Sequence, residues 1–267
     1  MKAWEKVFEI PVKGRSFKPR KTGITMVIDK GLGIRETKDL IEMASDYIDV
    51  IKLTFGTSAF YKKEVCIKKN KLLREAGIDV MPGGTFLEVA VWQGVYDNYL
   101  KRAKELGFSA IEVSDGTIEM DLKTRDIVVK KAIEAGFKVI SEIGKKSPKD
   151  KQPLELLFEE INQDLRNGAF KVIVEAREAG KGVGIYDETG KIKEEEVNAI
   201  LLGVKDSDCL IWEAPLKSQQ EYLILKFGVN VNLGNIPPED ILALEALRQG
   251  LRGDTLKKAY LEKGVKK

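Results

Sequence analysis

Acidic, basic and amide side chains recur at similar places along this sequence, each near the end of a short run of β-branched and other apolar residues. These positions are Asp29, Lys52, Glu112, Asp115, Glu142, Lys146, Glu175, Arg177, Glu213 and Asn232. Carboxylates buried without partners are strongly destabilising. We therefore expect the acidic groups to pair with Lys52, Lys146 and Arg177, or to bind a divalent cation.

The residue types that are missing narrow the chemistry. The chain contains no histidine, which excludes the usual general base and every Ser-His or Cys-His mechanism. Proton transfer must fall to Lys, Glu, Asp, Tyr or a metal-bound water. Its two cysteines, Cys66 and Cys209, lack metal-ligand spacing, and we expect them to be ordinary thiols. A site rich in oxygen and poor in His and Cys suits Mg²⁺ rather than zinc.

The elements that must position these groups alternate between strand-like and helix-like segments, with a period of about 30 residues. The expected strands are 23–31, 49–56, 79–85, 110–116, 138–146, 171–178, 209–215 and 229–235. The expected helices are 36–47, 62–76, a long helix ending at Gly107, 121–135, 153–167, 193–204, one closing at Gly228, and 238–250. Eight such units in 267 residues predict an α/β fold, a single-domain (β/α)₈ TIM barrel.

The domain organisation follows from this pattern. We expect an N-terminal extension at 1–22, the barrel at 23–256 and a frayed tail at 257–267. The competing fold, an open doubly wound sheet, would more often carry a glycine-rich nucleotide turn after the first strand. In the turn DKGLGIRE, the segment GLG is too short to match that fingerprint.

In a TIM barrel the active site lies at the carboxyl ends of the strands. Strand alternation places Glu142 and Lys146 on one face, so Lys146 is a better inward candidate than Lys145. The same alternation groups Glu175 with Arg177, Ile211 with Glu213, Val27 with Asp29, and Asn230 with Asn232.

Two glycine-containing turns could bind an anion through backbone amides. In NLGNIPPED, Asn232, Gly234 and Asn235 precede a predicted helix start, and loops after the last two strands commonly hold a phosphate in this fold. A plain Asn/Gly turn before a proline-initiated helix is the alternative. After the third strand, Gly83 and Gly84 form a tight turn with exposed amides.

Composition argues against several partners. The net charge is only +3, with 45 basic and 42 acidic residues spread along the chain, which indicates no nucleic-acid partner. No stretch approaches the roughly 20 apolar residues of a membrane span, and the N-terminus lacks a signal core. We expect a cytoplasmic protein without a membrane partner. Apolar residues such as Trp4, Phe8 and Trp92 leave room for a homo-oligomer.

Taken in order, long segments of the chain resemble the phosphosulfolactate synthase family. The matching segments are KPRKTGITMVIDKGLG, SDYIDVIKLTFGTS, MPGGTFLE, IEVSDGT, SEIGKK, VIVEAREAGKG, IWEAPLKSQQ, ILKFG, VNLGNI and LEALRQGLRGDT, from about residue 18 to 256. The chain departs from the family at LTFGTS, where a W-G-T-S run is usual, and at NLGNI, where N-L-A-N-I is usual.

The resemblance implies a Mg²⁺-dependent carbon–sulfur lyase that joins sulfite to phosphoenolpyruvate, giving (2R)-phospho-3-sulfolactate. In methanogens this reaction starts coenzyme M biosynthesis, and bacterial relatives feed sulfolactate production. Lys146 matches the family's lysine after E-x-G and would be the general acid, with a pKa lowered toward neutrality by partial desolvation.

The remaining site residues are assigned with that reaction in mind. Metal ligation would fall to Glu142, Glu175, Asp29, Glu112 and Glu213. Lys52 and Arg177 would hold the phosphate and sulfite, and the substrate-binding residues would be Asn232, Gly234, Asn235, Gly83, Gly84, Ser114 and Asp115.

Two other functions remain open from the sequence. A sugar-phosphate aldolase or isomerase would keep the barrel and use Lys52 or Lys146 as a Schiff-base nucleophile. A non-catalytic, stress-related barrel protein would resemble the family's plant heat-stress-associated members.

Overall fold

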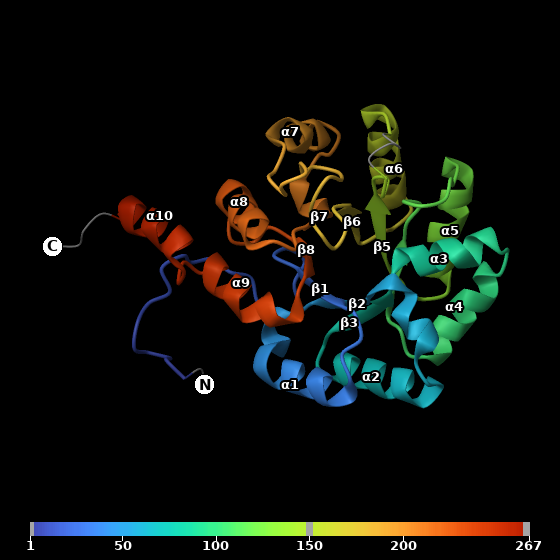
Figure 1. The fold of residues 1–267 in the computed structure, drawn as a ribbon, viewed down its shortest axis with the longest axis horizontal. Helices are drawn as coiled ribbons and strands as arrows, with labels where there is room; N and C mark the ends of the chain where they lie inside the picture. The colour runs from blue at the N-terminus through green and yellow to red at the C-terminus, as the bar shows by residue number, and fades with distance from the viewer. Residues whose placement is uncertain (1–2, 148–151, 264–267) are drawn as a thin grey trace.

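The computed structural model describes residues 3–147 and 152–263, and eight parallel strands lie at its centre with helices around them (Figure 1). The strands pair in the order β3-β2-β1-β8-β7-β6-β5-β4, so β1 and β8 join the two ends of the chain. They are β1 (Thr25–Asp29), β2 (Val50–Leu53), β3 (Asp79–Pro82), β4 (Ala110–Val113), β5 (Lys138–Ile143), β6 (Lys171–Val174), β7 (Leu210–Glu213) and β8 (Leu233–Ile236). This arrangement confirms the predicted single-domain (β/α)₈ barrel.

The barrel is nearly closed, and its seam lies between β3 and β4. These two strands share no ladder, but the Ser109 amide donates to the Val80 carbonyl at 3.1 Å just below β4. At the upper end of the same seam, the Gly84 amide donates to the Glu112 carboxylate. Side-chain and turn contacts therefore hold the barrel together where strand pairing stops.

The helices follow the strands in the predicted order. They are α1 (Ile34–Ala44), α2 (Lys63–Glu75), α3 (Gly84–Trp92), α4 (Tyr96–Glu105), α5 (Leu122–Glu134), α6 (Leu154–Arg166), α7 (Glu194–Leu202), α8 (Lys217–Phe227), α9 (Ile241–Arg248) and α10 (Gly253–Lys263), with short 3₁₀ segments such as η2 (Thr54–Phe60). The single helix expected to end at Gly107 was wrong: α3 and α4 are separate, because Gly94 adopts a φ of +67° between them.

The ends of the chain differ in part from the prediction. Residues 257–263 continue helix α10 rather than fraying, while 1–2 and 264–267 lie outside the described residues. Within the predicted extension, Arg15 pairs with Glu245 at 3.0 Å and the Lys18 amino group donates to the Ile48 carbonyl at 2.7 Å. Residues 15–20 therefore pack on the side of the barrel where the strands begin.

The barrel interior changes from apolar to charged along the strands. One buried cluster inside the barrel contains Val50, Ala110, Ile140, Ile173 and Ile211 among its members. Side chains two residues further along a strand point the same way, and these are Lys52, Glu112, Glu142, Glu175 and Glu213. The sequence therefore places a charged layer directly above an apolar one, at the carboxyl end of the barrel.

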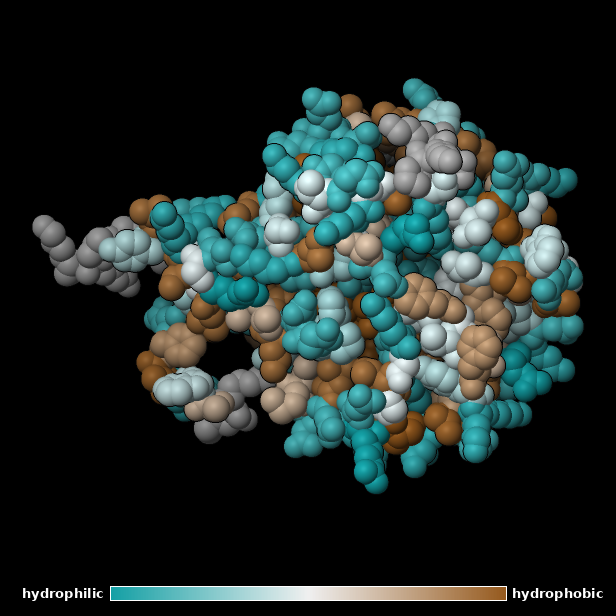
Figure 2. All heavy atoms as spheres, in the orientation of Figure 1, coloured by the Kyte–Doolittle hydropathy of each residue, from teal (hydrophilic) through white to brown (hydrophobic). Residues whose placement is uncertain are grey.

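The molecular surface is mixed in character. Figure 2 shows hydrophilic residues spread over the face in view, with hydrophobic residues between them. Trp4, Phe8 and Trp92 are exposed, by 69%, 48% and 74%. No helix in the described residues is both long enough and apolar enough to cross a membrane.

A buried arginine on α5 ties two helices to the end of β4. The Arg125 guanidinium donates to Asp164 at 2.7 Å, to Asp115 at 3.0 Å and to the Glu142 carbonyl at 2.9 Å. Arg125 and Asp164 are both at most 1% exposed. The network thus links α5, α6, β5 and the β4 turn without solvent.

We predict that Arg125→Met lowers the free energy of unfolding by about 3–5 kcal/mol, because it leaves two buried carboxylates without a cation. Urea denaturation at pH 7 measures the change. The control is Lys130→Met on the same helix, which removes an exposed pair with Asp126 and should cost less than about 1 kcal/mol. Equal losses in the two variants would contradict the buried network's role.

Candidate functional site

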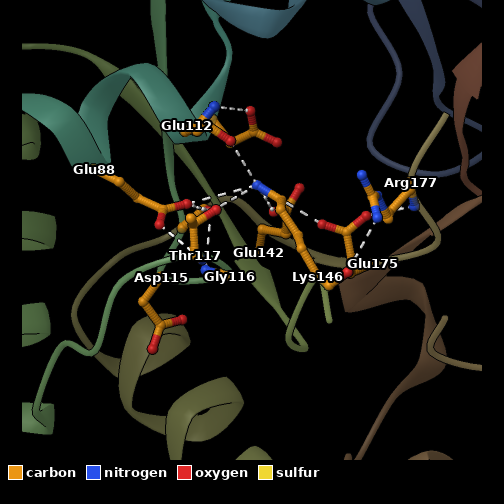
Figure 3. Close-up of polar contacts among 12 residues, drawn as sticks. Glu88, Glu112, Asp115, Gly116, Thr117, Glu142, Lys146, Glu175 and Arg177 are labelled. Carbon is orange, nitrogen blue, oxygen red and sulfur yellow. Dashed lines mark hydrogen bonds and ion pairs between the residues drawn. The ribbon is translucent and has the colours of Figure 1, made fainter. Parts of the chain in front are cut away.

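A cavity of about 750 Å³ opens at the carboxyl ends of the strands. Its lining combines the charged layer of the barrel and Asn235 of β8 with the turns that follow β2, β3, β4, β5 and β6. Figure 3 shows the side chains that converge there, with the Lys146 amino group at the centre of several carboxylates. The site therefore lies where a TIM barrel performs its chemistry.

Lys52 on β2 forms the floor of this cavity and is only 5% exposed. Its amino group lies 2.7 Å from Glu112, 3.1 Å from Glu213 and 3.4 Å from Glu142. Burial alone would lower the pKa of Lys52, but the three carboxylates outweigh it and raise that pKa well above its usual value. Lys52 is thus a fixed positive charge that allows acidic groups from three strands to be buried together.

Lys146 enters the cavity from the turn after β5, and its amino group lies closer to solvent than that of Lys52. It donates to the Thr85 hydroxyl at 2.9 Å and lies 3.3 Å from Glu142 and 3.8 Å from Glu175. Burial would lower the pKa of Lys146, but the surrounding carboxylates raise it above its usual value. The expectation of a lowered lysine pKa was therefore wrong, because partial desolvation is weaker here than the attraction of the neighbouring anions.

Three carboxylates converge closely enough to share one cation. Glu142, Glu175 and Glu213 each offer an oxygen, and these oxygens all lie within 4.8 Å of one another. Among the described residues, Glu142 Oε1 and Glu175 Oε2 accept no hydrogen bond, although both are buried. Burial and the charges of Glu142 and Glu213 raise the pKa of Glu175. A hard divalent cation would relieve this repulsion, and an all-oxygen donor set fits Mg²⁺.

Glu112 belongs to the same charged layer, but both of its oxygens are already engaged. One accepts from Lys52 and the other from the Gly84 amide at the start of α3. Burial raises the pKa of Glu112 to about 8, despite the opposing effect of Lys52. The structure therefore gives Glu112 a part in closing the seam between β3 and β4.

Three predicted site residues lie away from the cavity. Asp29 faces the helices, where it pairs with Lys69 of α2, because alternation along β1 points Val27 and Asp29 outward. Asp115 lies past the end of β4 and points away from the Lys146 amino group (Figure 3). Its carboxylate pairs with Arg125 at 3.0 Å.

Asn232 is the third, and it lies at the opposite end of the barrel. Strand β8 begins only at Leu233, so Asn232 precedes it and its side chain bonds to Ile24 N, Asp208 O and Leu210 O. The expected strand at 229–235 began too early, because a turn closed by Val231 N and Gly228 O follows α8.

The other predicted residues lie in or beside the cavity. Arg177 is at its rim, with φ +59° and its guanidinium 3.3 Å from the Lys146 carbonyl. Because β6 ends at Val174, strand alternation does not extend to Arg177. Asn235 lines the cavity, is 3% exposed and keeps Oδ1 without a hydrogen-bond partner among the described residues.

The glycines and Ser114 act through close packing. Gly83 and Gly84 line the cavity at the start of α3, but the expectation of exposed amides was wrong, because these amides donate to the Leu53 carbonyl and the Glu112 carboxylate. A Cβ on Gly84 would lie 2.6 Å from Ser114 Cβ. Gly234 lies deeper, where a Cβ would approach Met26 Cε to 2.6 Å. The glycine in NLGNI therefore contacts the apolar interior of the barrel, below the charged layer.

Sequence reasoning missed two side chains on α3 that contact Lys146. These are Thr85 and Glu88, the second of which is 1% exposed and lies 3.6 Å from the Lys146 amino group. Glu88 is the one charged residue in the helix GTFLEVAVW. A lone acid in an apolar helix that follows a site turn was the signal that could have found it.

We predict that Lys52→Met lowers the free energy of unfolding by about 3–5 kcal/mol at pH 8, because three buried carboxylates lose their cation. Burial already raises the pKa of Glu112 to about 8, and loss of the opposing Lys52 charge raises it further above that of the unfolded chain. A raised folded-state pKa contributes stability that is present at low pH and lost as pH rises, so the deficit should shrink toward pH 5.

Urea denaturation at pH 5, 6.5 and 8 measures this dependence, with Lys130→Met as the exposed-lysine control. A deficit that stays constant across the three pH values would show that Lys52 stabilises the barrel by packing alone.

Comparison with known proteins agrees with the geometry. The family model of (2R)-phospho-3-sulfolactate synthase (ComA) matches residues 13–254. Phosphosulfolactate synthase of Methanothermobacter thermautotrophicus is 46% identical over 256 residues, covering 95% of this chain and 99% of the relative. The enzyme of that name from Methanocaldococcus jannaschii is 45% identical, covering 88% and 94%. Protein HEAT-STRESS-ASSOCIATED 32 of Arabidopsis thaliana is only 21% identical, covering 88% of each chain.

Proposed function

Because the chain belongs to the (2R)-phospho-3-sulfolactate synthase family, we propose that it adds sulfite to phosphoenolpyruvate, giving (2R)-phospho-3-sulfolactate. The chain is an enzyme of the lyase class, as its curated relatives are. The observation that carries the specific reaction is the cavity itself. It sets a protonated lysine beside three convergent carboxylates at the catalytic end of the barrel.

The reaction forms one carbon–sulfur bond and delivers one proton to carbon. The sulfur of sulfite attacks the methylene carbon C3, and the electrons of the double bond move to C2 and its carboxylate. A proton delivered to C2 from one face completes the product, and the phosphate ester stays intact. The site must therefore stabilise negative charge on the carboxylate and supply a proton beside C2.

Mg²⁺ would be held by Glu142, Glu175 and Glu213, whose oxygens converge and include two without hydrogen bonds among the described residues. When bound, the ion supplies Lewis-acid stabilisation of the developing carboxylate charge. This ligand set is narrower than the one predicted from sequence, because Asp29 faces α2 and Glu112 is engaged by Lys52 and Gly84.

Lys146 would be the proton donor. Its neighbours keep it protonated at neutral pH, and the Thr85 hydroxyl holds its amino group in the cavity. Lys52 would balance the charge of the floor rather than contact substrate, since three carboxylates surround it. Arg177 and Asn235 would bind the phosphate and sulfite groups, since the Gly83 and Gly84 amides already donate to Leu53 and Glu112.

The aldolase alternative receives no support from the site. A Schiff-base lysine must be available as a free amine, whereas carboxylates raise the pKa of both Lys52 and Lys146. A cytoplasmic location stays a prediction of the sequence. A homo-oligomer, suggested by exposed residues such as Trp92, remains a proposal.

The direct test mixes purified protein with phosphoenolpyruvate, sulfite and MgCl₂, follows loss of the enol absorbance and identifies the product by mass spectrometry. We expect phosphosulfolactate to form, turnover to stop when a chelator is added, and Mg²⁺ to restore it. A folded protein that makes no product under these conditions would refute the proposed reaction. Turnover that survives chelation would refute the metal requirement alone.

We predict that Lys146→Met lowers kcat by about 10²–10⁴-fold, because it removes the group that protonates C2. The KM for phosphoenolpyruvate should change far less, since other groups bind the anion. Lys145→Met is the neighbouring control, because Lys145 pairs with Asp115 outside the cavity and should cost less than about tenfold. Comparable losses of kcat in the two variants would rule out Lys146 as the proton donor.

A further inference from the structure

The carboxylate of Glu88 is buried beside the site without any assigned role. It comes from helix α3, whose other side chains are all uncharged, and it is 1% exposed. A buried carboxylate is costly unless hydrogen bonds and a cation compensate it. The groups that compensate Glu88 therefore indicate why the fold tolerates it.

The two oxygens of Glu88 face different partners. Oε2 accepts hydrogen bonds from the amides of Thr117 and Ile118, both at 2.8 Å. Oε1 accepts from the Ser114 hydroxyl at 2.7 Å and lies 3.6 Å from the Lys146 amino group. One oxygen thus anchors the turn after β4, and the other faces the proposed proton donor.

The turn after β4, at 116–118, also contacts the backbone and the aliphatic part of Lys146. The Lys146 amide donates to the Gly116 carbonyl at 3.0 Å, and the aliphatic part of Lys146 lies over Gly116. A Cβ on Gly116 would lie only 3.0–3.2 Å from three carbons of the lysine. Glu88 therefore contacts Lys146 directly at its tip and supports its stem through the turn.

Groups on two sides of the cavity attract the Lys146 amino group. Thr85 and Glu88 on α3 lie on one side, at 2.9 Å and 3.6 Å. Glu142 and Glu175, two of the proposed metal ligands, also attract the amino group, at 3.3 Å and 3.8 Å. Figure 3 shows Glu88 and Glu175 on opposite sides of the amino group. Without the Glu88 carboxylate on α3, the Lys146 ammonium would shift toward Glu142 and Glu175.

We propose that Glu88 is a positioning residue that keeps the Lys146 amino group at Thr85 on α3, against the attraction of Glu142 and Glu175. The inference rests on the proposed function, because it assumes that Lys146 delivers the proton. A displacement of about 1 Å of such a group can cost on the order of 100-fold in rate. The effect should therefore fall on kcat rather than on substrate binding.

Glu88→Gln separates this role from that of a turn anchor. The amide oxygen of Gln can take the place of Oε2 and accept from Thr117 and Ile118, while its NH₂ group donates to Ser114. The turn is then kept, but an NH₂ group replaces the anion that faces Lys146. A residue that only anchored the turn would tolerate this change.

We expect Glu88→Gln to lower kcat by about 10–100-fold, with the KM for phosphoenolpyruvate changed by less than about threefold. In a Lys146→Met background the same substitution should add almost nothing, because Glu88 acts through the lysine. The matched control is Glu245→Gln, which removes a buried carboxylate paired with Arg15 at the other end of the barrel and should leave kcat unchanged.

A crystal structure of the Glu88→Gln variant gives a readout that needs no activity. We expect the Lys146 amino group to leave Thr85 while the turn at 116–118 stays in place. Wild-type kcat with Lys146 still at Thr85 would overturn the proposal. If the variant does not fold, Thr85→Val removes the other α3 contact without touching the turn; it should lower kcat in the same way, and wild-type kcat there would also overturn the proposal.

Failure of the proposed function would be recognised separately. Wild-type protein that forms no phosphosulfolactate would refute the reaction, whereas the position of Lys146 in the variant crystal would still test what Glu88 does.

Discussion

The burial of Lys52 among three carboxylates is the interaction on which the rest of the site depends. Glu112, Glu142 and Glu213 come from three different strands, and none could be placed in the barrel interior without a cation between them. The apolar layer beneath, which includes Val50 and Ile140, keeps water from screening these charges. The same low-polarity surroundings that make the cluster costly also make its electrostatic effects strong.

The groups above Lys52 lie on two sides of the cavity and have different proposed roles. Glu175 joins Glu142 and Glu213 on the side where a cation would be held, with buried oxygens left free of hydrogen bonds among the described residues. The start of α3 forms the other side, where Gly84 closes the barrel seam onto Glu112 and Thr85 holds Lys146. One helix end therefore both completes the barrel and orients the proposed proton donor.

Strand alternation predicted much of the site, and its failures have physical causes. It placed Glu142 correctly because β5 is regular up to Ile143, whereas Lys146 lies past Gly144, whose φ is +103°, and reaches the cavity from a turn. It could not orient Asp29, because strands buried on both faces carry apolar residues at every position, and β1 is buried throughout. For Asn232 the error lay in where β8 begins, which a turn after α8 decides. The raised pKa of Lys146 could not be predicted either, since it depends on carboxylates from other strands and from a helix.

The sequence by itself determined the eight strand–helix units and the apolar layer followed by charged residues, because both follow from the local periodicity of apolar and polar residues. It also determined the family, through long ordered segments. The tertiary structure alone decided which three of the five candidate carboxylates converge, and it brought Glu88 of α3 next to Lys146. The converging carboxylates Glu142 and Glu213 are 71 positions apart in the sequence. Their distance in space is set by barrel closure, and that of Glu88 from Lys146 by helix docking, rather than by a local sequence pattern.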